Sequence, residues 1–196
     1  MGTVEFWFEF ASTYSHIAAQ TIGRASEDAG VTVVWRPFLL GPIFKAQGWT
    51  DSPFNLYPAK GTYMWRDMER ECARLGVPFR KPTQFPRNGL LAARVATAAE
   101  DERWQPDFVR RVYQANFVED ADIGDVDVLR ECLAGSCDPD HWLNAGRTDR
   151  VRDLLRKRTE EAVAAGIFGA PTFRVHGEVF WGADRLEQAL ELAARM

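Results

Sequence analysis

The first forty residues combine two hydrophobic periodicities. At the start every second residue is apolar, which is the period of a β-strand. These residues are Val4, Phe6, Phe8 and Phe10. From Tyr14 the apolar spacing becomes helical, and Gly30 stands where a helix commonly ends. A second alternating run, 31–35, is ended by Pro37. We therefore predict strand, helix, strand: a βαβ unit with parallel strands and a right-handed crossover.

The last thirty residues carry the complementary pattern. Segment 171–175 is short and strand-like, Gly177 marks a turn, and 179–181 resumes a strand, so we predict a hairpin. Asp184 then starts a predicted helix with apolar residues at helical spacing. These residues are Leu186, Leu190 and either Ala193 or Ala194. The order at this end is strand, strand, helix.

The long middle, residues 42–164, is almost wholly helical in pattern. Apolar residues at helical spacing predict helices near 63–75, 91–99, 108–117, 125–133 and 148–164. The first of these stripes comprises Tyr63, Met64, Met68, Cys72 and Leu75. Segments 37–58 and 79–88 are irregular. We predict a small mixed α/β sheet with a helical domain inserted after its second strand.

Composition narrows the class of protein. A chain of 196 residues, 46% of them hydrophobic, predicts one globular domain, or one domain with an insertion. The 24 Lys and Arg against 28 Asp and Glu leave a net charge of −4 and no electrostatic reason to bind nucleic acid. Neither a signal peptide nor a membrane-spanning segment is recognisable, so we expect a soluble, cytoplasmic protein.

The cysteines exclude several kinds of chemistry. Cys72, Cys132 and Cys137 are too few and too scattered for a disulfide framework, and no Cys-x-x-Cys is present for a redox pair or a zinc site. Cys72 fits an apolar helix face. Cys132 and Cys137 flank a Gly-Ser turn, where they could sense oxidants or could have no chemical role. His141 and His176 stand apart from the cysteines, so we expect no metal.

Three short segments could carry chemistry. After the first strand, Ser12 and Thr13 precede a helix whose N-terminus favours an anion, although either hydroxyl could simply cap that helix. Pro171 follows two glycines at a strand start, which suits a cis bond that frees the Ala170 backbone for a ligand, or an ordinary strand-start proline. Asp184 could cap the last helix or bind an amino-acid-like group.

Together these motifs resemble one family. They are Phe-x-Phe-x-Phe followed by Ser, Tyr and Ser; Tyr-Pro-Ala-Lys-Gly-x-Tyr-Met at 57–64; Gly-x-Phe-Gly-x-Pro-Thr-Phe at 166–173; and Phe-Trp-Gly-x-Asp-Arg-Leu at 180–186. In this order they resemble the 2-hydroxychromene-2-carboxylate isomerases, relatives of the kappa-class glutathione transferases. The resemblance implies an α/β, DsbA-type thioredoxin-like fold (βαβ…ββα), with 1–41 and 165–196 forming the thioredoxin-like domain and 42–164 an inserted all-helical domain.

The resemblance also implies residue roles. Ser12 stands where redox relatives carry a cysteine, and it would hydrogen-bond the glutathione thiolate and lower its pKa. Ala170, before a cis Pro171, would pair with the cysteinyl backbone of glutathione, and Asp184 with Ala183 would hold its γ-glutamyl end. Lys60 and Asn55 match further glutathione contacts. Asp51 is a rival for the role of Asn55.

The chain departs from the family pattern beside Ser12. Thr13 replaces a proline that many relatives carry, and it could add a second hydroxyl to the helix N-terminus. His16 lies one helical turn beyond Ser12. A Ser–His pair is conceivable there, but we expect a surface or interface histidine because no Gly-x-Ser-x-Gly elbow accompanies it.

The function predicted from the resemblance is a glutathione-dependent isomerase of aromatic catabolism, acting as a homodimer on a 2-hydroxychromene-2-carboxylate or hydroxybenzylidenepyruvate-type keto acid. The alternatives are a kappa-class transferase or peroxidase and a non-catalytic glutathione-binding protein. A thiol–disulfide oxidoreductase is disfavoured because Ser12 replaces the required thiol. Trp49, Trp65 and Trp181 are candidates to line a groove for an aromatic substrate.

Overall fold

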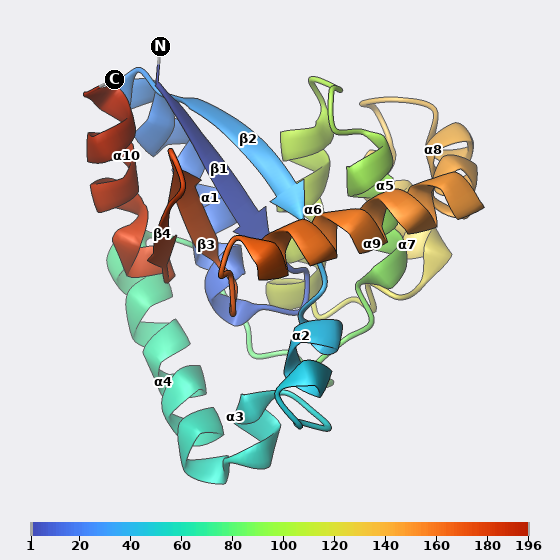
Figure 1. Ribbon diagram of the computed structural model, residues 1–196. Coiled ribbons are helices and arrows are strands. Elements are labelled where there is room, and N and C mark those ends of the chain that lie inside the picture. The colour runs from blue at the N-terminus through green and yellow to red at the C-terminus, as the bar shows by residue number, and fades with distance from the viewer. Residues whose placement is uncertain (1, 196) are drawn as a thin grey trace.

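The computed structural model describes residues 2–195, which form a four-stranded mixed sheet surrounded by helices (Figure 1). The strand order is β2-β1-β3-β4. β1 (Thr3–Phe8) pairs in parallel with β2 (Thr32–Pro37) and antiparallel with β3 (Thr172–Val175), which continues into β4 (Glu178–Trp181) as a hairpin. Helix α1 (Thr13–Ala29) connects β1 to β2 and ends at Gly30, whose φ of 65° is left-handed. The βαβ and hairpin predictions are confirmed.

One face of the sheet packs on α1 and the C-terminal helix α10 (Leu186–Ala194). The alternating apolar residues of β1 point to this face and are fully buried among aromatic rings. Phe6, for example, stacks on Phe173 and meets the edge of Trp35, with ring centroids 5.6 and 5.1 Å away. The period-2 pattern of the first strand therefore builds the main core.

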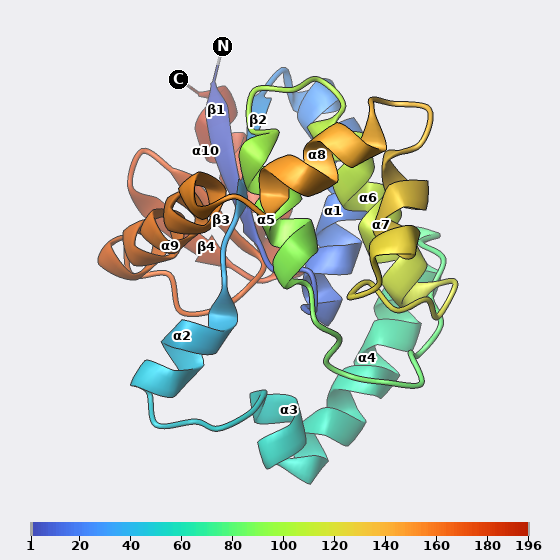
Figure 2. The same ribbon diagram turned by 90° about the vertical axis from the view of Figure 1, so that its right-hand side faces the viewer.

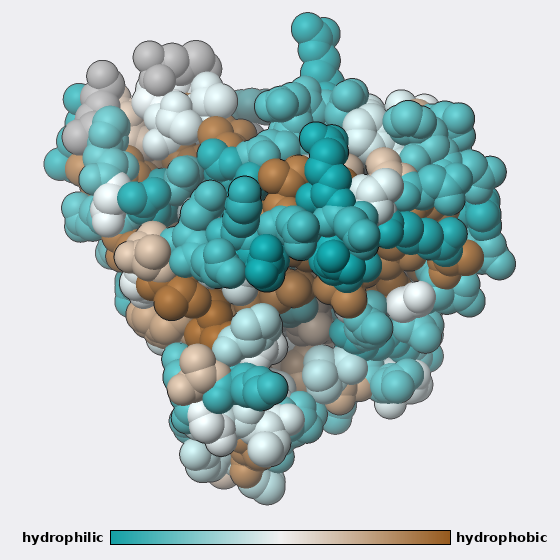
Figure 3. All heavy atoms as spheres, turned by 45° about the vertical axis from the view of Figure 1, so that its right-hand side comes forward, coloured by the Kyte–Doolittle hydropathy of each residue, from teal (hydrophilic) through white to brown (hydrophobic). Residues whose placement is uncertain are grey.

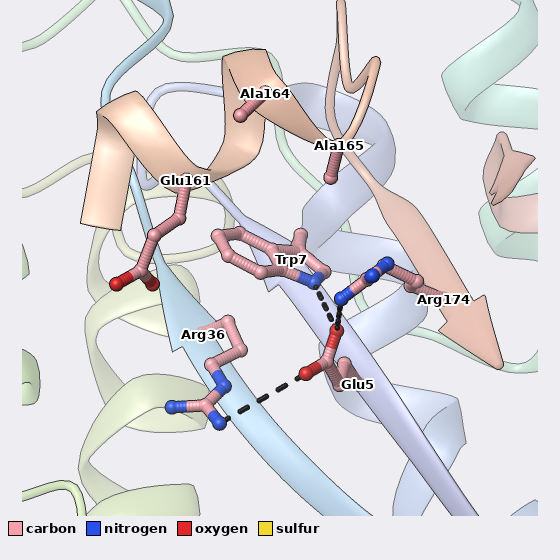
Figure 4. A pocket seen from close by; sticks show the side chains of 7 residues that line it. All are labelled: Glu5, Trp7, Arg36, Glu161, Ala164, Ala165 and Arg174. Atoms are coloured by element: carbon pink, nitrogen blue, oxygen red, sulfur yellow. Dashed lines mark hydrogen bonds and ion pairs between the residues drawn. The ribbon is translucent and has the colours of Figure 1, made fainter. Parts of the chain in front are cut away.

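The other face of the sheet is covered by the end of α9 (Asp149–Ala164), which crosses it before the chain enters β3 (Figure 1). Trp7 is buried there, and a hollow beside it holds an ion network (Figure 4). Glu5 accepts hydrogen bonds from Trp7 Nε1 at 3.1 Å and from Arg174 at 3.2 Å, and lies 3.9 Å from Arg36. The Glu5 carboxylate is thus fully compensated within the chain.

The remaining helices follow β2. They are α2 (Leu40–Ala46), α3 (Pro53–Leu56), α4 (Pro58–Leu75), α5 (Leu90–Ala98), α6 (Gln105–Phe117), α7 (Val126–Leu133), α8 (Pro139–Gly146) and α9. α5 to α8 lie beside the sheet, whereas α2, α3 and most of α4 project beyond the strand end that leads into α1 (Figures 1 and 2). The projecting helices lie across from the β1–α1 turn. The division into residues 1–41 with 165–196 and residues 42–164 stays a prediction.

Several expectations about the helices were wrong. Segment 37–58 contains α2 and α3, and α8 was not predicted, because these short helices have too few turns to show a period. In the α4 stripe, Met64, Met68 and Cys72 are buried, but Tyr63 and Leu75 are exposed because α4 packs along a narrower face than the pattern predicts. Asp184 lies in a single turn of 3₁₀ helix, Ala183–Arg185, and does not cap α10.

Candidate functional site

The β1–α1 turn places Ser12 at the N-cap of α1. Its Oγ accepts the N–H of Ser15 at 3.3 Å, so the capping interpretation is confirmed. The same hydroxyl donates to the carbonyl oxygen of Ala170 at 2.9 Å, across 158 residues of sequence. Ser12 therefore both begins the helix and joins the turn to the segment before β3.

The second predicted motif lies directly against Ser12. The Ala170–Pro171 bond is cis, as predicted. The carbonyl oxygen of Pro171 accepts the N–H of Gly182 at 3.0 Å, which brings the third motif to the same place. The N–H of Ala170 has no partner among residues 2–195. Three segments that are far apart in sequence thus meet in one site.

The first turn of α1 leaves hydrogen-bond donors free. Within residues 2–195 the N–H groups of Thr13 and Tyr14 have no acceptor, as expected for the first positions of a helix. The hydroxyl of Thr13 does not join them. It is buried and donates to Met64 Sδ at 3.3 Å, so the expectation of a second hydroxyl at the helix end was wrong. The physical reason is that Met64 packs against this turn and covers the Thr13 side chain.

The site opens onto a large groove, of about 2500 Å³, between the body of the protein and the projecting helices. Its lining includes Ser12, Ala170, Pro171, Ala183 and Asp184. Apolar residues reach the surface where the projecting helices meet the body of the protein (Figure 3). Sites for small organic ligands are typically ~300–1,000 Å³, so the groove has room for two ligands side by side.

The far wall of the groove carries Lys60 and Asp51. Asn55 is exposed but not among the residues that line the groove, and its Nδ2 donates to Asp51 Oδ2 at 3.0 Å. The Lys60 ammonium lies over the ring of Tyr57, 4.8 Å from its centroid. Of the two rivals, Asp51 is therefore the one that faces the groove.

Asp184 stands at the near wall, two residues after Gly182. Its carboxylate folds back over Gly182, where a Cβ would lie 2.5 Å from Asp184 Oδ1. It is largely exposed and lies 3.3 Å from the Arg185 guanidinium. The carboxylate is thus available to a cationic group of a ligand, in competition with Arg185.

Aromatic side chains border the groove on two sides. Phe168 and Trp181 pack together with ring centroids 5.0 Å apart, and both are about half exposed. Phe44 and Trp49 form a second pair at 5.4 Å. Trp65, a residue of α4, does not belong to this lining; it packs against Phe79 and Phe85. Trp49 and Trp181 therefore line the groove, as predicted, and Trp65 does not.

His16 is fully buried, so the prediction of a surface or interface histidine was wrong. Nε2 lies 2.9 Å from the carbonyl oxygen of Pro78, and the ring packs against Tyr113 and Phe117. Burial lowers the pKa of His16 from 6.5 to about 4, so the imidazole is neutral at pH 7. Nε2 is engaged with Pro78, and the buried Nδ1 has no hydrogen-bond partner among residues 2–195, so the structure contains no Ser12–His16 pair.

Glu9 was missed at the sequence level. It continues the alternation of Glu5 and Trp7, on the side of the first strand opposite Phe6 and Phe8, and it lines the groove beside Ser12. Oε2 accepts the N–H of Ala11 at 2.9 Å, and burial raises the pKa of the carboxyl from 4.5 to about 7. The available signal was an acidic residue three positions before Ser12, at the junction of strand and helix.

The protein's own thiols lie outside the site. Cys72 and Cys132 are buried, and burial raises their pKa values to about 11 and about 12. Burial also raises the pKa of Cys137. Such thiols remain protonated and unreactive at pH 7, which disfavours the oxidant-sensing alternative.

Within residues 2–195, no group of three or more His, Cys, Asp and Glu side chains is arranged to hold a metal ion. No helix in the same part of the chain has the length and apolar character needed to span a membrane.

Comparison with known proteins identifies the family. The family model for the DSBA-like thioredoxin domain matches residues 3–193. The chain belongs to this family.

Curated relatives are similar over nearly their whole length. A 2-hydroxychromene-2-carboxylate isomerase from Sphingobium xenophagum is 28% identical over 188 residues, covering 94% of both chains. A kappa 2 glutathione S-transferase from Caenorhabditis elegans is 25% identical, covering 97% of this chain and 91% of its own. These names support an enzyme of the isomerase and glutathione transferase kind.

A solved structure of 2-hydroxychromene-2-carboxylate isomerase superposes with a TM-score of 0.86 at 22% identity, covering 98% of this chain and 95% of that one. The cytosolic disulfide reductase DsbM from Pseudomonas aeruginosa with GSH gives a TM-score of 0.67 at 17% identity. At these identities both likenesses show the fold alone. The predicted fold class, a thioredoxin-like fold with helical additions, is thereby confirmed.

Proposed function

We propose that this DSBA-like domain is a glutathione-dependent isomerase of an unsaturated aromatic keto acid of the 2-hydroxychromene-2-carboxylate or hydroxybenzylidenepyruvate type. The observation that carries the proposal is the meeting of Ser12, Ala170 and Gly182 at the free end of α1. The names of the similar isomerases and transferases support it.

The residues at this end fit the cysteinyl part of glutathione. The unpartnered N–H groups of Thr13 and Tyr14 and the dipole of α1 favour a thiolate there. The Ser12 hydroxyl can turn from the Ala170 carbonyl to the sulfur, because a hydroxyl rotates about a single bond. The free N–H of Ala170 can pair with the ligand backbone as in an added strand.

When bound, glutathione supplies a thiolate whose reversible addition turns a double bond of the substrate into a single bond that can rotate. The chain's own contribution is to hold and orient the reacting groups and to stabilise negative charge. Ser12 is the proposed catalytic residue, and Ala170 and Pro171 are proposed to align the cysteinyl backbone. Asp184 and Ala183 are proposed for the γ-glutamyl end. Lys60 is proposed for the far end together with Asp51, which lines the groove, in place of Asn55, which does not.

The aromatic pairs that border the groove fit an aromatic keto acid. Phe168 and Trp181 lie next to Ala170, and an aromatic substrate can stack on their half-exposed rings. An apolar wall beside a thiolate site also matches the chemistry of a planar, conjugated acceptor. Homodimer formation and a cytoplasmic location stay predictions.

A kappa-class transferase or peroxidase is the second candidate, since kappa transferases from several animals are about as similar as the isomerases. An assay of the keto acid with and without glutathione separates the alternatives. An isomerase requires glutathione but does not consume it, whereas a transferase consumes one molecule per turnover. Turnover that is undiminished without glutathione contradicts the proposal, and tight binding without any activity identifies a binding protein.

A further inference from the structure

The Glu9 carboxyl lies at the same helix end as the proposed sulfur position. Ala11, whose N–H it accepts at 2.9 Å, directly precedes Ser12. The backbone oxygen of Glu9 accepts the N–H of Ser12 at 2.9 Å and the hydroxyl of Tyr113 at 2.8 Å. The Glu9 backbone is thus fixed from two sides, while its side chain lines the groove.

No cation balances this carboxyl. Among residues 2–195 none of the ion pairs includes Glu9, in contrast to Glu5 four residues earlier. The titratable group that responds to the Glu9 charge is Tyr113 of α6, whose pKa is raised by burial and then by Glu9. His16 of α1 packs against the other side chains here, 6.2 Å from the Tyr113 ring centroid, and is neutral at pH 7. Glu9 is therefore the group in this part of the site that gains or loses a proton near pH 7.

Two anions would compete for one helix N-terminus if both a thiolate and the Glu9 carboxylate were present. Like charges that share a partly dry site cannot both ionise easily, and one of them keeps a proton. A ligand thiol enters with a proton, and the Glu9 carboxylate lines the same groove at the same helix end as Ser12. The simplest charge distribution moves that proton from sulfur to oxygen.

We propose that Glu9 is a catalytic base that takes the thiol proton of bound glutathione, an inference that rests on the proposed function. The S–H bond breaks, an O–H bond forms on the Glu9 carboxylate, and the electron pair stays on sulfur. The negative charge of the site stays at one throughout. The N–H groups of α1 and the Ser12 hydroxyl then stabilise the thiolate, and the proton returns to sulfur when glutathione leaves.

A purely structural role for Glu9 predicts something different. If its carboxylate only accepts the Ala11 N–H, then Glu9→Gln preserves the function, because the amide oxygen accepts the same hydrogen bond. If Glu9 acts as a base, it must gain a proton, which the carboxylate can do near pH 7 and the amide of Glu9→Gln cannot. The variant therefore separates the two roles without a change in side-chain length.

The test counts protons during glutathione binding. Titration calorimetry at pH 7.5 in buffers of different ionisation enthalpy gives the protons released, and absorbance near 240 nm gives the thiolate formed. With a thiol pKa near 8.5 and Glu9 near 7, thiolate formation frees about 0.9 proton, of which Glu9 retains about 0.75. We expect about 0.15 proton per thiolate in the wild type and about 0.9 in Glu9→Gln. Glu160→Gln, an exposed α9 variant, should match the wild type.

A second measurement needs no variant. At pH 6 Glu9 is already protonated, so proton release by the wild type should rise to about 0.9 per thiolate. Equal release at pH 6 and 7.5, or equal counts in the wild type and Glu9→Gln, would overturn the role of Glu9 alone. Failure to bind glutathione at all would overturn the proposed function as well.

Discussion

The hollow beside Trp7 and the groove at the end of α1 treat polar groups in opposite ways. In the hollow beside Trp7, the Glu5 carboxylate is balanced by Arg36 and Arg174 and accepts the indole N–H. In the groove at the end of α1, Glu9 has no cation, and the N–H groups of Thr13 and Ala170 have no acceptor among residues 2–195.

This difference separates a hollow that is stabilised by its own residues from a groove that is suited to bind a ligand. Buried polar groups are normally paired, and a set that is left unpaired around an open groove is a binding site awaiting its ligand. Glu5 and Glu9 lie four residues apart in the same strand-forming segment, so sequence alone gives no reason to assign them different roles. The structure distinguishes them by their interaction partners, because Glu5 has two arginines and Glu9 has no cation within residues 2–195.

The largest expected effect comes from Ser12→Ala, which removes the hydroxyl from the groove. Loss of a single donor to a developing or stored anion commonly costs ~10²-fold in rate. We expect glutathione-dependent isomerisation to fall by about that factor, with a raised pKa of the bound thiol, measured by initial rates and thiolate absorbance.

Ser12→Ala also removes a helix cap, which costs ~1 kcal/mol of folding free energy. Thr148→Ala is the matched control, because Thr148 caps α9 by accepting the N–H of Val151 and is remote from the groove. It should lose similar stability and keep full activity. Equal activity losses in the two variants would mean that Ser12 acts only through stability.

The next largest effect is expected on the pH dependence of stability, to which the buried His16 contributes. Its pKa is about 4 when folded against 6.5 when unfolded, so its contribution to stability is present above pH 6.5 and is lost as the pH falls toward 4. We expect His16→Gln to remove ~2 kcal/mol of the loss between pH 7 and pH 5, measured by urea unfolding.

Glu9 acts with the opposite sign. Its pKa is raised from 4.5 to about 7, so its contribution is fully present below pH 4.5 and is lost as the pH rises through 7. The pH dependence of wild-type stability contains both contributions, so the contribution of His16 is obtained by subtracting the unfolding free energy of His16→Gln from that of the wild type at each pH. A His16 ring resonance that titrates near pH 6.5 in nuclear magnetic resonance would contradict the buried, neutral imidazole.

A smaller effect is expected in the compensated hollow. Glu5→Gln leaves Arg36 and Arg174 without their shared carboxylate and should lower the free energy of unfolding by ~1–2 kcal/mol. Glutathione affinity should not change, as measured by calorimetry. A fall in affinity as large as that of Ser12→Ala would erase the distinction between the two hollows.

The smallest effect is expected at the exposed rim. Asp184→Asn removes a carboxylate that is largely exposed and shared with Arg185, so the loss in glutathione affinity should be about fivefold, or ~1 kcal/mol. Asp184→Asn should weaken the binding of S-methylglutathione by the same factor, because this ligand lacks a free thiol but keeps the γ-glutamyl end that Asp184 is proposed to bind. An unchanged affinity would remove Asp184 from the site.

Sequence reasoning succeeded where a pattern repeats or a motif is contiguous. The alternation in β1, the glycine at the end of α1 and the cis Pro171 were all predicted, and the meeting of three motifs followed from the family resemblance. These features depend on local backbone preferences and on a strand and helix order that sequence expresses directly.

It failed where a side chain's partner comes from a distant segment. Nothing near Thr13 in sequence indicates that Met64 covers its hydroxyl, and nothing near His16 indicates the carbonyl of Pro78, 62 residues away. Glu9 and Glu5 looked alike for the same reason. Charge compensation is a tertiary property, and only the packed structure assigns it.

A crystal structure of the protein with glutathione tests the proposed site most directly. We expect the sulfur within hydrogen-bond distance of Ser12 Oγ at the end of α1, with the cysteinyl backbone paired to Ala170 and the Ser12 hydroxyl turned away from the Ala170 carbonyl. Glutathione bound with its sulfur in the Glu5 hollow, or anywhere else remote from Ser12, would contradict it.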